Sequence, residues 1–149
     1  MISAAAALPD ELPISIEPAG PGDEAAIVDH WAKGLRFTHG WRALPLVIAD
    51  HAARAHIRAL IAREETRVTV ARPALPEAWA DTLCGFCVHG GDVLHWIYTR
   101  KQWREQHVAS RLIASLFYGS PITATHWSPA MSFHSHRWNV TLSPGRIYG

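Results

Sequence analysis

The sequence predicts an α/β protein of the α+β kind, in which helices pack against a mixed β-sheet. Short runs alternate apolar and polar residues, as strands do, and two longer runs repeat apolar residues with a helical period. A third run, residues 94–116, reads as a buried strand, a basic turn and an amphipathic helix. Because 149 residues are enough for one core, we expect a single domain over residues 1–149.

The first half of the chain is expected to hold two strands and two helices. The alternating residues 13–18 predict a strand, and residues 23–33 predict a helix with Asp23 as its N-cap and Gly34 as its stop. A longer helix is expected from residue 45, and the β-branched run 66–72 predicts a strand. The predicted apolar positions of the longer helix are Leu46, Ile48, Ala52, Ala55, Ile57, Leu60 and Ile61.

The second half is expected to contain a hairpin, a helix and a further strand. Residues 82–89 and 92–99 form the hairpin around a glycine turn. Residues 104–119 read as a helix closed by its final glycine, and residues 121–127 as a strand. Residues 129–149 form an atypical tail in which a short helix and a last strand over 139–142 are expected.

Composition excludes several classes of protein. The formal net charge of +1 indicates neither a nucleic-acid coat nor a membrane-surface protein, and no apolar run is long enough to span a bilayer. Residues 1–12 lack a basic start, so we expect a flexible segment rather than a secretory signal, and a cytoplasmic protein. Cys84 and Cys87 form a CxxC, but they lie on a predicted strand where positions three apart face opposite sides, so no metal site is expected.

Seven tryptophans suggest either an enlarged core or an aromatic contact surface. We expect core positions for four of them and a contact with substrate or partner for two in the C-terminal part of the chain. The expected core residues are Trp31, Trp41, Trp96 and Trp103, and the expected contact residues are Trp127 and Trp138.

The run Arg104-Glu105-Gln106-His107-Val108-Ala109 follows a predicted strand and opens a predicted helix. With the element order, it resembles the GNAT superfamily of acyl-CoA-dependent N-acyltransferases, whose fingerprint is Arg or Gln, two variable residues, Gly, one variable residue, and Gly or Ala. The flanking positions and the third strand "LCGFCV" are similar to the family as well. The matching flanking residues are Tyr98, Thr99, Trp103, Leu112 and Ile113.

The resemblance implies a GNAT-like mixed, mostly antiparallel sheet with helices on both faces, a shortened C-terminal part, and acetyl-CoA as co-substrate. The cofactor would lie where strands 92–99 and 121–127 separate. Its pantetheine arm would meet Ile97, Tyr98 and Thr99, and its pyrophosphate would meet the turn from Arg104 to Ala109. A helix N-terminus offers unpaired N–H groups to such an anion.

His107 departs from this fingerprint because the family has glycine at its position. Histidine is among the residues enriched at positive φ, and its imidazole can donate a hydrogen bond to phosphate. The alternative is that Arg104, Glu105 and His107 are only solvated residues at the start of a helix.

His95 is the candidate general base. It lies on the fourth predicted strand, nine residues before Arg104, as a functional histidine does in the similar arylalkylamine acetyltransferases. Alternation places it opposite Leu94, Trp96 and Tyr98, and the alternative is a half-buried packing histidine. The family's usual acid is a tyrosine, which the matching run "PAMSFHSHRW" lacks, so Ser132, His134 and His136 are candidate substitutes.

Two functions therefore remain open. One is acetyl transfer to a small-molecule or protein amine. The other is a GNAT-like protein without activity that serves as a binding or structural subunit, of the kind that phages encode for virions or DNA modification. Assembly of copies through the tail is expected in either case, because the shortened sheet leaves an edge that a partner chain could complete. Neither a membrane nor a nucleic acid is indicated as a partner.

Overall fold

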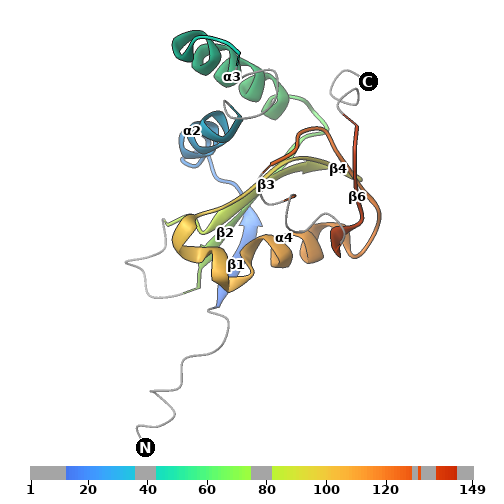
Figure 1. The fold of residues 1–149 in the computed structure, drawn as a ribbon. Helices are drawn as coiled ribbons and strands as arrows, with labels where there is room; N and C mark the ends of the chain where they lie inside the picture. The colour runs from blue at the N-terminus through green and yellow to red at the C-terminus, as the bar shows by residue number, and fades with distance from the viewer. Residues whose placement is uncertain (1–12, 36–42, 75–81, 129–130, 132–136, 144–149) are drawn as a thin grey trace, which may run out of the picture.

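A six-stranded sheet forms the centre of the molecule in the computed structural model, which describes residues 13–35, 43–74, 82–128, 131 and 137–143 (Figure 1). The first four strands pair antiparallel, whereas the fifth joins the fourth, and the sixth the fifth, in parallel. The predicted mixed, mostly antiparallel sheet is confirmed. In sheet order the strands are β1 (Ile14–Pro18), β2 (Arg67–Pro73), β3 (Gly85–Gly90), β4 (Val93–Thr99), β5 (Ile122–Ala124) and β6 (Val140–Leu142).

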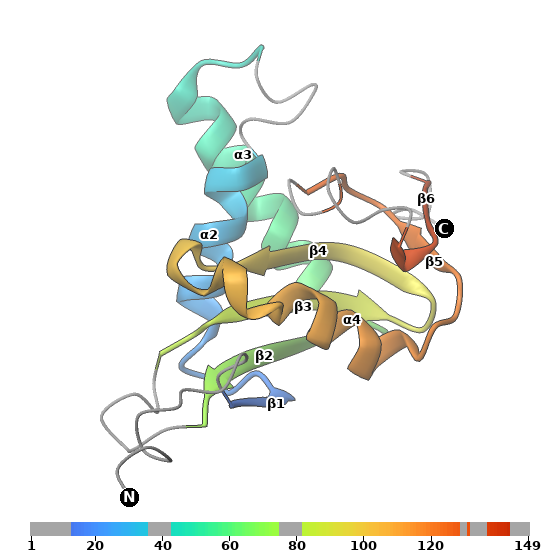
Figure 2. The same cartoon turned by 60° about the horizontal axis from the view of Figure 1, so that its bottom comes forward.

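Helices cover both faces of this sheet, as predicted. Helices α2 (Glu24–Leu35) and α3 (Leu46–Ile61) lie on one face, and α4 (Val108–Phe117) lies on the other (Figure 2). Each face has its own core cluster. Trp31, Phe86 and Trp96 belong to the cluster under α2 and α3, whereas Leu94 and Leu112 belong to the cluster under α4.

Gly34 does not stop α2, as the sequence suggested, but lies inside the helix. A Cβ at this position would lie 2.7 Å from Cζ2 of Trp96, closer than real contacts allow. The glycine is therefore explained by the close approach of α2 to an indole on β4, and the helix continues to Leu35.

The apolar positions predicted for α3 are only partly correct. Ile57 and Leu60 are buried, but the first turn is exposed, with Leu46 at 65% and Ile48 at 55% exposure. The buried stripe instead includes Ala49 and Ala53. The start of α3 extends past the sheet, so the described strands do not lie beneath its first turn (Figure 2).

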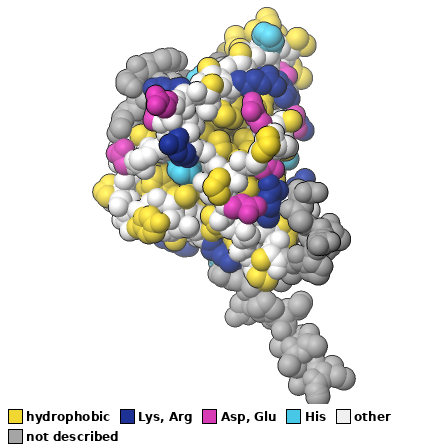
Figure 3. Space-filling view, turned by 180° about the vertical axis from the view of Figure 1, so that it is seen from behind, with side chains coloured by type: hydrophobic (Ala, Val, Ile, Leu, Met, Phe, Trp, Pro, Cys, Tyr) yellow, Lys and Arg dark blue, Asp and Glu magenta, His cyan; other side chains and the backbone are white. Residues whose placement is uncertain are grey.

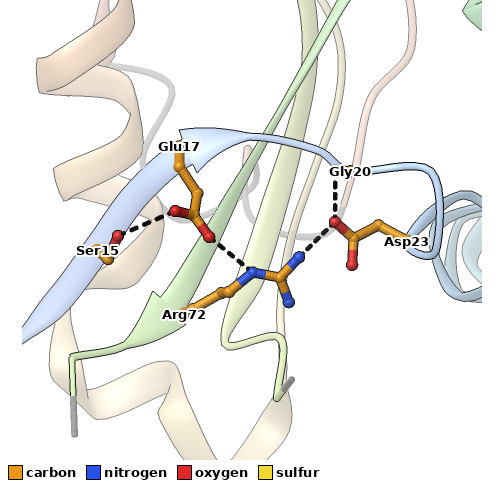
Figure 4. Close-up of polar contacts among 5 residues, drawn as sticks. All are labelled: Ser15, Glu17, Gly20, Asp23 and Arg72. Carbon is orange, nitrogen blue, oxygen red and sulfur yellow. Dashed lines mark hydrogen bonds and ion pairs between the residues drawn. The ribbon is translucent and has the colours of Figure 1, made fainter. Parts of the chain in front are cut away.

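Arg72 joins β1, β2 and the start of α2 through two carboxylates (Figure 4). Its Nε donates to Glu17 Oε1 at 2.8 Å, and Nη2 donates to Asp23 Oδ2. Asp23 also accepts the Gly20 N–H at 2.7 Å. Burial opposes ionisation of Asp23, but these hydrogen bonds outweigh it and lower the pKa of the carboxyl group. Asp23 thus precedes α2 as predicted, with its carboxylate tied to β2.

The tryptophans expected in the core are buried where the structure describes them. These are Trp31, Trp96 and Trp103, whereas Trp127 is 37% exposed. Trp138 is buried in the cluster under α4 but also lines a pocket, so its expected role as a contact residue stays a prediction. Trp41 lies outside the described residues.

The surface seen from behind carries interspersed acidic and basic side chains rather than one sign of charge (Figure 3). This distribution agrees with the small net charge of +1. Within the described part of the chain, no helix is long and apolar enough to cross a membrane.

Candidate functional site

Strands β4 and β5 separate soon after they meet. The parallel ladder pairs Val93 with Thr123 and Leu94 with Ala124, and the described ladder contains no further pair. One more backbone bond follows, from the Thr125 N–H to the Leu94 carbonyl at 3.0 Å. Because β4 continues to Thr99, the remainder of its edge lies next to the opening between the two strands.

His95 lies where the opening begins, at a β-bulge. Val88 pairs with Trp96 and His89 pairs with Leu94, which leaves His95 as the extra residue on β4. A bulge interrupts the alternation of side chains. The prediction that Leu94 and Trp96 share a face is therefore wrong, because Leu94 packs under α4 and Trp96 under α2 and α3. His95 itself is buried, with 6% exposure.

The turn after β4 has the backbone that the sequence motif required. A 3-10 helix, η2 (Lys101–Gln106), leads to His107 at φ 57° and ψ 32°, and α4 begins at the next residue. Helix α4 thus starts four residues later than predicted. His107 occupies the left-handed region, where glycine is the usual residue and histidine is tolerated.

Packing beneath the turn holds this conformation. Trp103 is buried under α4, and its backbone N–H donates to the Arg100 carbonyl at 2.8 Å. Gly85 on β3 lies so close to the turn that a Cβ would be 2.4 Å from the Tyr98 carbonyl oxygen and 3.2 Å from Val108 Cγ1. The glycine of "LCGFCV" therefore permits the start of α4 to approach the sheet.

The predicted pantetheine-binding residues form the end of β4. Ile97 is buried under α4, whereas Tyr98 lies on the other face and stacks on His30, with ring centroids 4.7 Å apart. Thr99 ends the strand, and its carbonyl accepts a hydrogen bond of 3.4 Å from Nε of the exposed Arg104. The guanidinium group is thus held beside the strand end.

The remaining predicted pyrophosphate residues all belong to the turn or to the first turn of α4. Glu105 and Gln106 end η2, and Val108 and Ala109 are the buried first residues of α4. The first intrahelical bond is donated by the Arg111 N–H to the His107 carbonyl at 3.0 Å. The N–H groups before it have no partner within the helix and point out of its N-terminus.

The candidate acids cannot be placed beside His95. Ser132, His134 and His136 lie outside the described residues, as does most of the tail 129–149 through which assembly was expected. Within the tail, the predicted last strand is confirmed as β6, which extends the sheet beyond β5.

Sequence reasoning missed three residues at the opening. The hydroxyl of Thr125 lies 2.8 Å from His95 Nδ1 and 2.8 Å from Nδ1 of His126. Nε2 of His126 lies 3.0 Å from Nε2 of His56 on α3. Thr125 and His126 lie beside His95 because β5 pairs with β4 in parallel, which no sequence pattern predicted. No sequence signal pointed to His56 either.

Burial keeps these imidazoles neutral. It is the largest cause that lowers the pKa of His95 to about 4, that of His126 to about 3, and that of His56. Arg63 lowers the pKa of His95 further, and Glu65 partly opposes it. A neutral imidazole has a free lone pair, so His95 is in the protonation state that a general base requires.

The two cysteines are buried together under α4, not on opposite faces, since Cys84 lies in a bend before β3. Burial raises the pKa of the Cys84 thiol to about 11 and also raises that of Cys87. Both thiols are therefore protonated near neutral pH, and neither is a candidate nucleophile.

No protein-family profile matches the sequence, and no curated protein matches it. Solved structures do match the fold. A structure assigned as an acetyl transferase from Pyrococcus furiosus is 15% identical, with a TM-score of 0.63 over 84% of this chain and 91% of that one. The aminoglycoside N-acetyltransferase AAC(6′)-Iy, solved in complex with CoA, is 16% identical, with a TM-score of 0.50 over 91% and 92% of the two chains.

These matches define the class of the fold. At such low identity the likeness concerns architecture alone. The protein has the GNAT acetyltransferase fold, as the resemblance at residues 104–109 suggested.

Proposed function

We propose that the protein is an acyl-CoA-dependent N-acetyltransferase. The observation that carries this proposal is the conformation of His107, which makes the left-handed turn before α4 although the usual glycine is absent. A backbone that keeps this curvature still directs its N–H groups toward a bound anion. Positive φ is less favourable at a residue with a Cβ than at glycine, so its retention at the start of α4 supports a turn that still serves a ligand.

Acyl-CoA matches the dimensions of the site. Thr99 lies four positions after His95 on β4, which corresponds to about 13 Å of extended strand. A pyrophosphate at the N-terminus of α4 and a thioester beside His95 require an extended arm between them, as pantetheine provides. The arm could hydrogen-bond to the edge of Ile97–Thr99, where the described ladder has no partner strand.

The chemistry follows from the position of His95. A neutral amine would attack the thioester carbonyl in the opening between β4 and β5, and His95 would accept the proton that its nitrogen loses. Arg104 and the N-terminus of α4 would neutralise the pyrophosphate. The CoA complex of AAC(6′)-Iy supports this assignment, because that protein has a similar fold and is an aminoglycoside N-acetyltransferase.

Calorimetry with two ligands tests the proposal. Acetyl-CoA should bind the wild type, and Arg104→Ala should weaken it roughly tenfold or more, the effect of a lost hydrogen bond to a charged group. S-Acetylpantetheine lacks the pyrophosphate, so its affinity should not change in this variant. Arg58→Ala, on the exposed side of α3, is the matched control. Absence of acetyl-CoA binding up to millimolar concentration would reject the enzyme and favour a non-catalytic role.

A further inference from the structure

Four side chains from three separate segments form one continuous hydrogen-bonded chain. It runs from His95 Nδ1 to Thr125 Oγ1 over 2.8 Å, from that hydroxyl to His126 Nδ1 over 2.8 Å, and from His126 Nε2 to His56 Nε2 over 3.0 Å. Among the described residues no group of His, Cys, Asp or Glu is placed to hold a metal ion. Each of its three links joins two groups that can exchange a proton.

We propose that this chain is a proton relay, through which the proton accepted by His95 from the attacking amine is passed by way of Thr125 and His126 to His56. The inference rests on the proposed acetyltransferase function. It adds three residues to that function and identifies where the proton goes.

The single hydroxyl proton of Thr125 determines the order of donors. Thr125 can donate to only one imidazole, so it must accept from the other. In the arrangement that leaves His95 Nε2 with a lone pair, His95 Nδ1–H donates to Thr125 and the hydroxyl donates to His126 Nδ1. His126 Nε2–H then donates to His56 Nε2, and His56 carries its proton on Nδ1.

Proton transfer through this arrangement is balanced. His95 Nε2 gains the proton that the amine nitrogen loses, and each of the three shared protons moves one position toward His56. His56 Nδ1 then releases its proton to the medium, so no ring is left charged. In the reverse shift, a proton enters at His56 Nδ1, and His95 Nε2 gives its proton to the departing CoA thiolate. The net result is an N–H proton lost and an S–H proton gained.

The surroundings explain why a relay is favoured over storage of the proton on His95. The first two members are buried, with 6% exposure for His95 and 3% for Thr125, whereas His56 is half-buried. Burial disfavours an imidazolium on His95, and Arg63 adds to this effect. The charge of Glu65 favours the imidazolium and raises the pKa of His95, whereas His56 and His89 lower this pKa slightly. A neutral chain avoids that charge by moving protons in concert.

Two indoles hold His126 in position. Its ring meets Trp31 edge-on at 5.7 Å and 87°, and Trp96 at 6.4 Å and 78°. Trp31 and Trp96 are fully buried and stacked on each other at 5.8 Å. The two nitrogens of His126 face Thr125 and His56, and the packing of the indoles against its ring favours this orientation, as a proton path requires.

Thr125→Val removes the hydroxyl with little change of shape, and Thr125→Ser restores it. With an amine that the wild type acetylates, Thr125→Val should lower kcat at least about tenfold, with an unchanged KM for acetyl-CoA. Thr125→Ser should stay within about threefold of the wild type. The control is His51→Gln, an exposed histidine on α3 outside the chain, which should match the wild type.

Nitrogen-15 NMR of the histidine rings gives a second reading that needs no activity. We expect the Nδ1–H tautomer for His95, Nε2–H for His126 and Nδ1–H for His56. An Nε2–H tautomer on resting His95 would overturn the relay even if Thr125→Val fails to fold.

The outcomes separate the two proposals. An active wild type with Thr125→Val at full kcat overturns the relay and leaves the acetyltransferase assignment intact. A wild type that binds no acetyl-CoA overturns both, because the relay then has no proton to carry.

Discussion

His95 Nδ1 lies 2.8 Å from the hydroxyl of Thr125, and this pair spans the two strands that separate at the candidate site. One residue comes from the bulge in β4, and the other directly follows β5. The hydrogen bond occupies one ring nitrogen and leaves Nε2 to act on a substrate. The orientation of the candidate base is thus decided by a residue 30 positions away in the chain.

Replacement of His95 by alanine should lower kcat by roughly 10² or more, the usual effect of losing a general base. Affinity for acetyl-CoA should change little, because the turn that we propose binds its pyrophosphate follows the far end of β4. The contribution of His95 to the wild-type pH–rate profile should be an acidic limb near pH 4, separate from the protonation of the amine, since the pKa of His95 is lowered to about 4 and the neutral form is the base. That acidic limb should disappear in the variant.

His89 supplies the matched control for this experiment. It is the neighbouring histidine on β3, where Nε2 lies 2.8 Å from the Thr69 hydroxyl. His89→Gln should retain the wild-type kcat. An unchanged pH–rate profile in His95→Ala would instead identify His95 as a packing residue.

Acidification should destabilise the fold before the carboxylates titrate. The pKa of His95 falls from 6.5 to about 4 on folding and that of His126 to about 3. Below about pH 6.5 the unfolded chain therefore binds protons that the folded chain does not. The free energy of unfolding should decrease by about 1.4 kcal/mol per pH unit for each such histidine.

Denaturant titrations between about pH 7 and 4.5 would measure this slope, and His126→Phe should make it shallower while keeping an aromatic ring beside the indoles. The pKa of Asp29 is lowered to about 2 by Arg54 and Lys33, so its contribution is lost only at lower pH. A stability that does not vary over this range would contradict neutral buried histidines.

His107→Gly should bind acetyl-CoA as well as the wild type or better, because glycine adopts positive φ without strain. Removing the strain of a left-handed residue should stabilise the folded protein by about 1 kcal/mol. The greater flexibility of the unfolded chain partly offsets this gain in the free energy of unfolding. His107→Val is the opposing test, since a β-branched residue is a genuine outlier at positive φ. Valine should lower both stability and affinity. If the wild type, His107→Gly and His107→Val have the same affinity for acetyl-CoA by calorimetry and the same stability by denaturation, the turn binds no cofactor.

Gly34→Ala should destabilise the protein although it lies inside a helix. Alanine is favoured over glycine in a helix interior by about 1 kcal/mol. Here the new methyl group would lie 2.7 Å from the buried indole of Trp96, which is stacked on Trp31 and cannot move freely. We expect a net loss of about 1–3 kcal/mol, as for other overpacked cores. Gly22→Ala is the control, because nothing lies within 4 Å of a Cβ there.

Local patterns in the sequence were enough to predict the strands, the helices and the motif of the turn. Alternation and helical periodicity depend on neighbours in the chain, and so they indicate elements such as β2 and α3 without any tertiary contact. The resemblance of residues 104–109 to the GNAT fingerprint implied a turn that binds pyrophosphate, which stays a prediction. His107 was singled out because it replaces the glycine of that fingerprint, and the structure places it in the left-handed region.

Tertiary structure alone decided which side chains meet. The bulge at His95 is a register shift between two strands, and alternation along one strand cannot reveal it. Glycine is required at position 34 because the indole of Trp96 on β4 leaves no room for a Cβ, and nothing in the helix itself requires it. His56 and His126 lie 70 residues apart, and their hydrogen bond depends on the packing of α3 against the sheet. Periodicity constrains the direction of a side chain relative to its own element, whereas a site is made by contacts between elements.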